Sequence, residues 1–332
     1  MENILAKMTT EEKVGQLFLA HCPKENAEEV VSRLHLGGLL MFAHNFEDKT
    51  PDQVREYIKK CNAHAKIPLL IAADEEGGTV VRISKFRQFR EQPFKSPKDI
   101  YAEGGFDAVR REAEEKAELM LSLGVNYDLA PVCDYTDDES KYIAKRSFGH
   151  TPELCAEFIK TTVDAMKSKG LCCSLKHFPG YGGNSDTHFG MSVDVRDLSE
   201  FETKDLLPFR AGIGSGAGSV MVAHNIVNCM DPEYPASLSY PVHSYLRDKM
   251  SFDGVIITDS LTMNAIRQFT SGADPCVRAL LCGNDMIITS LFEEGYNCIL
   301  NAVNNGAVPM SRLDEAVSRI LRMKRSISLD IR

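Results

Sequence analysis

The 332-residue sequence contains no tryptophan, so a site that stacks a ligand on an aromatic face has only phenylalanine and tyrosine available. A membrane-spanning run is also lacking. The longest uncharged stretch, Ala211–Met230, holds four glycines and several polar side chains, which makes it a poor span. The N-terminal segment mixes charged and apolar residues, which is not the pattern of a signal peptide. We therefore expect no membrane partner.

A surplus of basic residues is absent as well. Lysine and arginine number 38 against 47 aspartates and glutamates, which gives a formal net charge of −9. This balance argues against nucleic-acid partners, which bind basic patches. The ten cysteines are scattered and never form the C-x-x-C pair typical of zinc sites. We expect reduced thiols in a cytoplasmic protein with no metal and no cofactor.

Eight short runs that are apolar on both faces recur along the chain. Continuous apolar runs indicate strands of a parallel sheet covered by helices, because a half-exposed sheet alternates apolar and polar residues. The predicted strands are Gly15–Ala20, Gly38–Ala43, Pro68–Asp74, Asn126–Ala130, Leu171–His177, Ser219–His224, Gly254–Asp259 and Asp285–Thr289.

Helical patterns separate these runs. Thr50 and Pro51 form an N-cap and first position for a helix over Pro51–Ala65, and Thr151 with Pro152 opens another that ends near Gly170. Apolar spacing predicts two more helices, over Asp107–Leu123 and Ser311–Met323.

Eight strand–helix units predict an α/β fold of the (β/α)8 TIM-type barrel kind, as a single domain over residues 1–332. The alternative is a doubly wound open sheet, which often has a glycine-rich turn after its first strand. The glycine-rich segment Gly212–Gly216 precedes a strand, and we expect it to be a loop.

Ionisable side chains stand where four of the predicted strands end. The third strand is followed by acidic residues from Asp74, and the fifth ends in Lys176 and His177. The sixth and seventh end in His224 and Asp259. Barrel active sites lie at this rim. Charged groups after long apolar runs are costly unless they are paired or used, so four on one rim favour a catalytic site over salt-bridged rim residues.

Asp259 and the loop after Lys176 each have a plainer interpretation. Asp259 on its own also fits the N-cap of the next helix. After Lys176 the chain continues in a loop rich in glycine that carries Asp186 and His188, two residues apart. That spacing allows the carboxylate to orient the imidazole, although a solvated polar loop has the same composition.

Several segments together resemble glycoside hydrolase family three, in order from about Glu11 to Arg325. The quoted segments are Ala73–Gly78 (ADEEGG, similar to D-Q-E-G-G), Arg146–Gly149 (RSFG), Lys176–Gly180 (KHFPG), Asp186-x-His188, Pro235–Ser239 (PASLS) and Thr258–Leu261 (TDSL). Each segment alone is weak, but the combination is specific. The nearest branch resembles the single-domain bacterial β-N-acetylglucosaminidases (β-hexosaminidases) of peptidoglycan recycling.

The resemblance implies a retaining double displacement at the rim of the barrel. By position, Asp259 is the nucleophile, His188 the acid/base and Asp186 its partner in a dyad. A histidine suits the acid/base role because its unperturbed pKa lies near 6.5. The family's sugar-binding positions fall on Asp74, Arg82, Arg146, Lys176 and His177.

The implied partner is a small saccharide from which terminal N-acetylglucosamine is removed. The implied assembly is a monomer or a weak homo-oligomer. The length of the chain leaves no room for the second domain that many relatives carry. Without tryptophan, recognition of the sugar has to rely on charged hydrogen bonds, with phenylalanine, tyrosine or methionine as the apolar surfaces.

The sequence departs from the family pattern at four places. Tyr181 stands in place of a histidine, Thr79 in place of an arginine and Glu75 in place of a glutamine. The stretch between Gly182 and Asp186 is one residue shorter.

Alternative functions therefore stay open. These are a β-N-acetylglucosaminide phosphorylase, a β-glucosidase on the same scaffold, and an inactive sugar-binding protein. A metal-dependent amidohydrolase is also considered, since Lys176 and His224 fit its bridging lysine and metal histidine. The absence of an H-x-H pair argues against it.

Overall fold

The structure is a computed structural model, and it describes residues 2–182, 192–263, 266, 269 and 275–331. Its centre is an eight-stranded sheet in which every neighbouring pair is parallel. A parallel bridge between Ile257 and Met286 joins the two end strands and closes the sheet into a barrel. The strands, in spatial order, are β10 (Val255–Thr258), β7 (Ser219–Val222), β5 (Cys172–Phe178), β4 (Tyr127–Asp128), β3 (Leu70–Ala73), β2 (Gly38–Leu40), β1 (Phe18–His21) and β11 (Ile287–Thr289).

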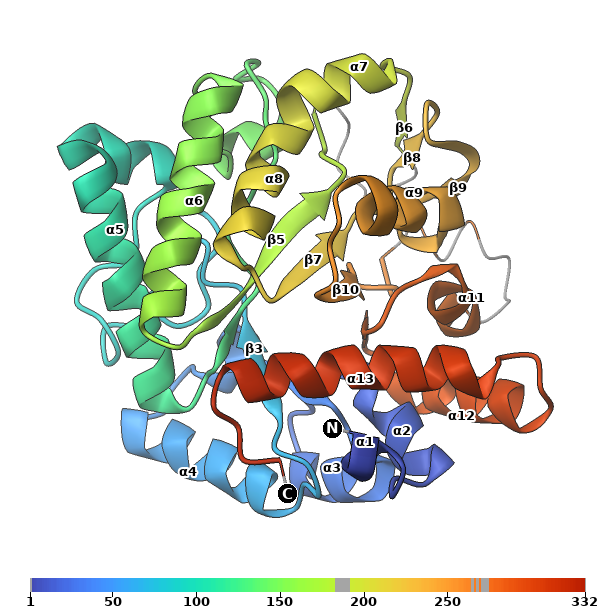
Figure 1. Cartoon of the computed structure of the whole chain (residues 1–332). Coiled ribbons are helices and arrows are strands. Elements are labelled where there is room, and N and C mark those ends of the chain that lie inside the picture. Colours follow the sequence, from blue (N-terminus) through green and yellow to red (C-terminus); the bar gives the residue numbers. More distant parts are fainter. Residues whose placement is uncertain (1, 183–191, 264–265, 267–268, 270–274, 332) are drawn as a thin grey trace.

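Helices alternate with these strands and cover the outside of the barrel (Figure 1). They are α1 (Glu2–Leu5), α2 (Thr10–Gln16), α3 (Ala27–Leu34), α4 (Pro51–Ala63), α5 (Pro97–Leu123), α6 (Pro152–Ser168), α7 (Leu198–Glu200), α8 (Leu206–Ser215), α9 (Tyr240–Ser244), α11 (Pro275–Cys282), α12 (Phe292–Asn304) and α13 (Met310–Ser326). Short 3₁₀ or π turns are η1 (Ala43–Asn45), η2 (Tyr142–Lys145), η3 (Phe201–Asp205), η4 (Ala236–Leu238) and η5 (Tyr245–Lys249). The predicted (β/α)8 barrel is confirmed.

The predicted helix starts are confirmed at α4 and α6. The Thr50 and Thr151 side chains accept the backbone N–H of Gln53 and Leu154, and a proline follows each threonine. Each cap satisfies a backbone donor that the helix leaves unpaired, which fixes where the helix begins.

The prediction of a loop over Gly212–Gly216 is wrong, because Gly212 to Ser215 form the end of α8. A Cβ on Gly212 would lie 2.5 Å from Leu175 Cδ2 and 2.9 Å from Ile159 Cγ2. The glycine therefore permits close packing of α8 on the barrel and on α6, and this packing outweighs the low helix propensity of glycine.

Some boundaries and one sheet also differ from the predictions. Gly15 and Gln16 belong to α2, so β1 begins at Phe18, and the helix predicted over Asp107–Leu123 already begins at Pro97. That helix, α5, is interrupted at Gly104 and Gly105, whose backbone angles are not helical. A small sheet of β6 (Val193–Asp194), β8 (Ile226–Val227) and β9 (Asp231–Pro235) has no counterpart among the predicted strands.

None of the helices within the described ranges has both the length and the apolar content to cross a membrane.

Candidate active site

A pocket of about 340 Å³ opens where the barrel strands end at their C-terminal side. Its size is in the range typical of small-molecule sites. Both polar and apolar side chains line it. The lining residues are His21, Leu40, Phe42, Asp74, Glu76, Val80, Arg82, Leu129, Tyr142, Arg146, Lys176, His177, Tyr181, Met221, Asp259, Ser260, Met263 and Ile288.

Asp259 comes directly after β10 and is held by two backbone hydrogen bonds. Its own N–H donates to the Val222 carbonyl at 3.1 Å, and its Oδ1 accepts the Ser260 N–H at 2.7 Å. Burial raises the pKa of Asp259, but electrostatic interactions with His224 and His177, the Ser260 N–H bond and the charge of Lys176 together lower it by more, so the pKa lies below its ordinary value. The carboxylate is therefore ionised at neutral pH and available as a nucleophile.

Two acidic and two basic side chains form a buried ion-pair network at the rim. The Lys176 Nζ lies 2.8 Å from Asp74 Oδ1 and 2.5 Å from Glu76 Oε1. The Arg146 guanidinium binds both Glu76 oxygens, at 2.9 and 2.7 Å. This bidentate geometry is the strong form of a charged hydrogen bond.

The network keeps its members charged in spite of their burial. Burial lowers the pKa of Lys176, but Asp74 and Glu76 raise it more, so it lies above the ordinary value. Burial raises the pKa of Glu76, whereas Arg146 and Lys176 bring it well below its usual range. The rim therefore presents fixed charges to a ligand.

Arg82 reaches the same rim from the loop after β3. Its guanidinium donates to Asp74 Oδ2 at 3.4 Å. Glu75 holds this loop in place. Its carboxylate accepts hydrogen bonds from the backbone N–H groups of Arg82, Ile83 and Ser84 and from the Ser84 hydroxyl.

His177 is oriented by Asp134. The ring Nδ1 lies 2.7 Å from Asp134 Oδ2, and the Nε2 lies 3.3 Å from the Arg146 guanidinium. Because Arg146 can only donate, Nε2 is the acceptor and the proton sits on Nδ1. Asp134 also accepts the Tyr181 N–H at 2.7 Å, so the residue that departs from the family pattern is part of the same support.

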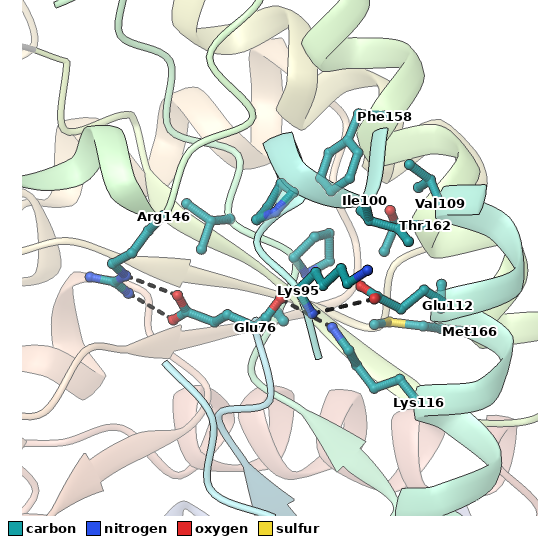
Figure 2. A pocket seen from close by; sticks show the side chains of 15 residues that line it. Glu76, Lys95, Ile100, Val109, Glu112, Lys116, Arg146, Phe158, Thr162 and Met166 are labelled. Carbon is teal, nitrogen blue, oxygen red and sulfur yellow. Dashed lines mark hydrogen bonds and ion pairs between the residues drawn. The ribbon is translucent and has the colours of Figure 1, made fainter. Parts of the chain in front are cut away.

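A second, much smaller cavity lies behind this rim, between α5, α6 and the segment after β4 (Figure 2). Glu76 and Arg146 line both cavities, so their ion pair forms part of the wall between them. Lys116 donates to the Glu76 carbonyl at 3.1 Å from the far side. The volume of about 20 Å³ suits one water molecule and excludes a sugar.

Six of the eight sequence-predicted site residues line the larger pocket: Asp74, Arg82, Arg146, Lys176, His177 and Asp259. Asp186 and His188 lie outside the described residues.

Sequence reasoning missed Glu76, Asp134 and His21. Glu76 lies in the segment Ala73–Gly78, where a second glutamate next to Glu75 was the feature that pointed to it. Asp134 follows the predicted end of the fourth strand by four residues, and His21 follows the predicted end of the first strand by one.

Comparison with known proteins gives a consistent result. The model of the glycosyl hydrolase family 3 N terminal domain matches residues 9–323. A beta-hexosaminidase of Methylococcus capsulatus is 31% identical over 288 residues, which cover 85% of this chain and 84% of the relative.

Solved structures agree with the sequence comparison. A glycoside hydrolase family 3 beta-N-acetylglucosaminidase from Paenibacillus sp. matches with a TM-score of 0.89 and 30% identity. The match covers 97% of this chain, but this chain spans only 63% of the length of that structure. The structure of beta-glucoside phosphorylase BglX matches with a TM-score of 0.87 and 25% identity, over 100% of this chain and 60% of the other.

Proposed function

Because this chain belongs to glycosyl hydrolase family 3, we propose that it is a retaining exo-β-glycosidase that removes terminal non-reducing N-acetylglucosamine from β-linked saccharides. The observation that carries the proposal is an ionised carboxylate, Asp259, in a pocket rimmed by fixed charges. The activity named for the Methylococcus and Paenibacillus relatives supports the choice of sugar.

The proposed reaction has two displacements. In the first, an Asp259 oxygen attacks the anomeric carbon, and the bond to the leaving oxygen breaks as His188 gives that oxygen a proton. In the second, His188 takes a proton from water, and the water oxygen displaces Asp259 from the anomeric carbon. Asp186 is proposed to orient His188. The roles of Asp186 and His188 are predictions from the family motif.

The ion-pair rim is proposed to hold the hydroxyl groups of the sugar. Asp74 and Lys176 neutralise each other, so a sugar hydroxyl meets both a charged donor and a charged acceptor. Arg146, His177 and Arg82 extend this surface around the pocket. Charged hydrogen bonds of this kind are about twice as strong as neutral ones, which offsets the lack of tryptophan for stacking.

Cell-wall fragments or chitobiose are the proposed natural substrates, and the cytoplasm is the proposed compartment. The likeness of the motif set to the peptidoglycan-recycling branch supports both. A panel of aryl N-acetylglucosaminide, glucoside and xyloside substrates tests the choice of sugar. Preference for the glucoside would favour the β-glucosidase alternative.

Replacing the nucleophile tests the reaction. Asp259→Asn should lose more than about 10³-fold in kcat on an aryl N-acetylglucosaminide, because an amide does not form the glycosyl ester. Asp253→Asn is the matched control, since Asp253 is an exposed carboxylate just before β10, at the opposite end of this strand from Asp259. If the wild type and Asp259→Asn bind the sugar equally and neither turns it over, the protein is instead a sugar-binding protein.

The role of His188 has its own test. His188→Ala should cost less activity on substrates with good leaving groups, because those need little protonation. Equal losses on good and poor leaving groups would count against His188 as the acid.

A phosphorylase is the second candidate, favoured by the structural likeness to beta-glucoside phosphorylase BglX. In that case phosphate replaces water in the second displacement and the product is a sugar 1-phosphate. Product analysis with and without inorganic phosphate separates the two, and a rate and product independent of phosphate would remove this candidate.

The amidohydrolase alternative is tested by exhaustive chelation, after which we expect full activity. Within the described residues, no group of three or more histidine, cysteine, aspartate or glutamate side chains is arranged to hold a metal ion. Loss of activity that added metal restores would revive this alternative.

A further inference from the structure

Ser260, the residue after the proposed nucleophile, is held through every polar group it has. Its N–H donates to Asp259 Oδ1 at 2.7 Å, and its carbonyl lies 3.0 Å from His224 Nε2. Its hydroxyl lies 3.2 Å from His21 Nε2 and 2.8 Å from the Thr262 hydroxyl. The direction of the Asp259 carboxylate therefore depends on how Ser260 is fixed.

The two imidazoles reach Ser260 from different parts of the barrel. His21 is the last residue of β1, and His224 follows β7, whereas Ser260 follows β10. His224 Nε2 faces a carbonyl, so it carries the proton, and Nδ1 accepts the Ser237 hydroxyl at 2.8 Å. His224 therefore fixes the main chain of Ser260, and His21 fixes its side chain.

His21 is itself placed with little freedom. Its ring packs edge-on against Phe42, with ring centroids 4.8 Å apart at an angle of 60°. It lines the pocket beside Asp259, and the sequence motifs assign it no role. An imidazole in this position does more than fill space, because it anchors the residue that donates to the nucleophile.

We propose that His21 is a positioning residue, which fixes the Asp259 carboxylate by holding the Ser260 side chain. The proposal rests on the proposed function, in which Asp259 is the nucleophile. A misplacement of about 1 Å at a reacting group costs about 10²-fold in rate, so the loss of such an anchor should be measurable in kcat.

Three variants test the proposal in steady-state assays with an aryl N-acetylglucosaminide. His21→Phe keeps an aromatic ring against Phe42 but removes the bond to Ser260, and we expect kcat to fall about 10- to 100-fold with little change in KM. His21→Gln keeps a polar side chain for Ser260 and should retain kcat within about threefold. His44→Phe is the matched control, since His44 stacks on the same Phe42 ring and should leave kcat unchanged.

A double-mutant cycle separates positioning from direct contact with the sugar. Ser260→Ala removes the hydroxyl through which His21 is proposed to act, so it should reproduce the loss seen in His21→Phe. The double variant should then be no worse than either single variant. Independent, multiplying losses would mean that His21 acts on the substrate and not through Ser260, and would overturn the proposal.

Other outcomes also decide the question. The proposal would be overturned if His21→Phe kept the wild-type kcat, or if His21→Gln and His21→Phe lost kcat to the same extent. Thermal unfolding of each variant shows whether a loss of kcat is due to misfolding. If a His21 variant misfolds, the kcat of Ser260→Ala tests the proposal in its place.

If the wild type turns over none of the glycosides, the proposed function fails by itself. Crystal structures then test the positioning. An Asp259 carboxylate displaced from the Ser260 N–H in His21→Phe supports the proposal, and an unchanged contact overturns it.

Discussion

Two adjacent carboxylates after β3, Glu75 and Glu76, take different roles because neighbouring side chains of an extended segment point to opposite sides. Glu76 faces the pocket and pairs with Arg146 and Lys176. Glu75 faces away from it and binds backbone groups of the loop that carries Arg82. The glutamate found here in place of the family's glutamine is thus explained by its four hydrogen-bond donors.

Replacing Glu75 by glutamine should loosen this loop. A glutamine has one acceptor oxygen, and its amide N–H groups would face backbone donors, so Glu75→Gln should cost about 1–3 kcal/mol of unfolding free energy. Urea denaturation measures this, with Glu91→Gln, at an exposed glutamate, as the control. Equal midpoints for the two variants would contradict the role given to Glu75.

Lys324 on α13 is a fully buried amine in the outer layer of the barrel. Its Nζ donates to Gln16 Oε1 at 2.7 Å, and burial lowers its pKa to about 7. In the unfolded chain the amine has its ordinary, higher pKa. Between about pH 7 and that value the unfolded state therefore binds more protons than the folded one, and the Lys324 contribution to stability rises with pH.

A pH series on Lys324→Met tests this sign. From pH 7.5 to 9.5, the unfolding free energy of the wild type should rise by about 2 kcal/mol relative to the variant. Lys59→Met, at an exposed lysine on α4, should track the wild type at every pH. A parallel course of wild type and Lys324→Met would show that the buried amine stays charged.

Helix α8 shows at the scale of elements how packing decides what a local pattern leaves open. Its segment Gly212–Gly216 has the composition of a loop, and the close packing of Gly212 on Leu175 and Ile159 favours its helical course. Those partners lie more than thirty residues away in the sequence, which is why the pattern alone predicted wrongly. Helices with a threonine cap and a proline, such as α4, were predictable because their signal is local.

Two glycines of α8 form a matched pair for mutation. Gly212→Ala should destabilise the protein by about 1–3 kcal/mol, because the added Cβ meets Leu175 and Ile159 in the core. Gly214→Ala should stabilise it by about 0.5–1 kcal/mol, because Gly214 is exposed, has open space around it and lies in the same helix. Thermal melts of both variants are the measurement, and shifts of the same sign would contradict this account of α8.

At the scale of the whole molecule, one barrel collects residues that are far apart in the sequence. Asp74, Lys176 and Asp259 were found because each stands at or near the end of a predicted apolar strand and such ends share a rim. Asp134 and His21 were missed because the contacts that distinguish them are made with His177 and Ser260, which belong to or follow other strands of the barrel. A single sequence predicts where the strands end, but it does not predict which side chains of different strands come into contact.

The core also predicts how the ten cysteines react in the native protein. None is in a disulfide, eight are buried, and Cys229 and Cys298 are partly exposed. A short pulse of iodoacetamide on the folded protein should label these two, and the remaining eight should react only after unfolding. Mass spectrometry of the digested protein locates the labels, and early labelling of Cys172 or Cys173 would show that the barrel opens locally.

The small cavity behind the Glu76–Arg146 pair has an evolutionary consequence. Ala113 and Val109 on α5 line it without reaching the sugar-sized pocket. We expect a larger side chain at either position to fill this cavity and to displace the side chains that line it, Glu76 and Arg146 among them. If the pocket binds a sugar as proposed, substitutions on an outer helix therefore give selection a way to change the sugar preference while every residue of the pocket stays the same.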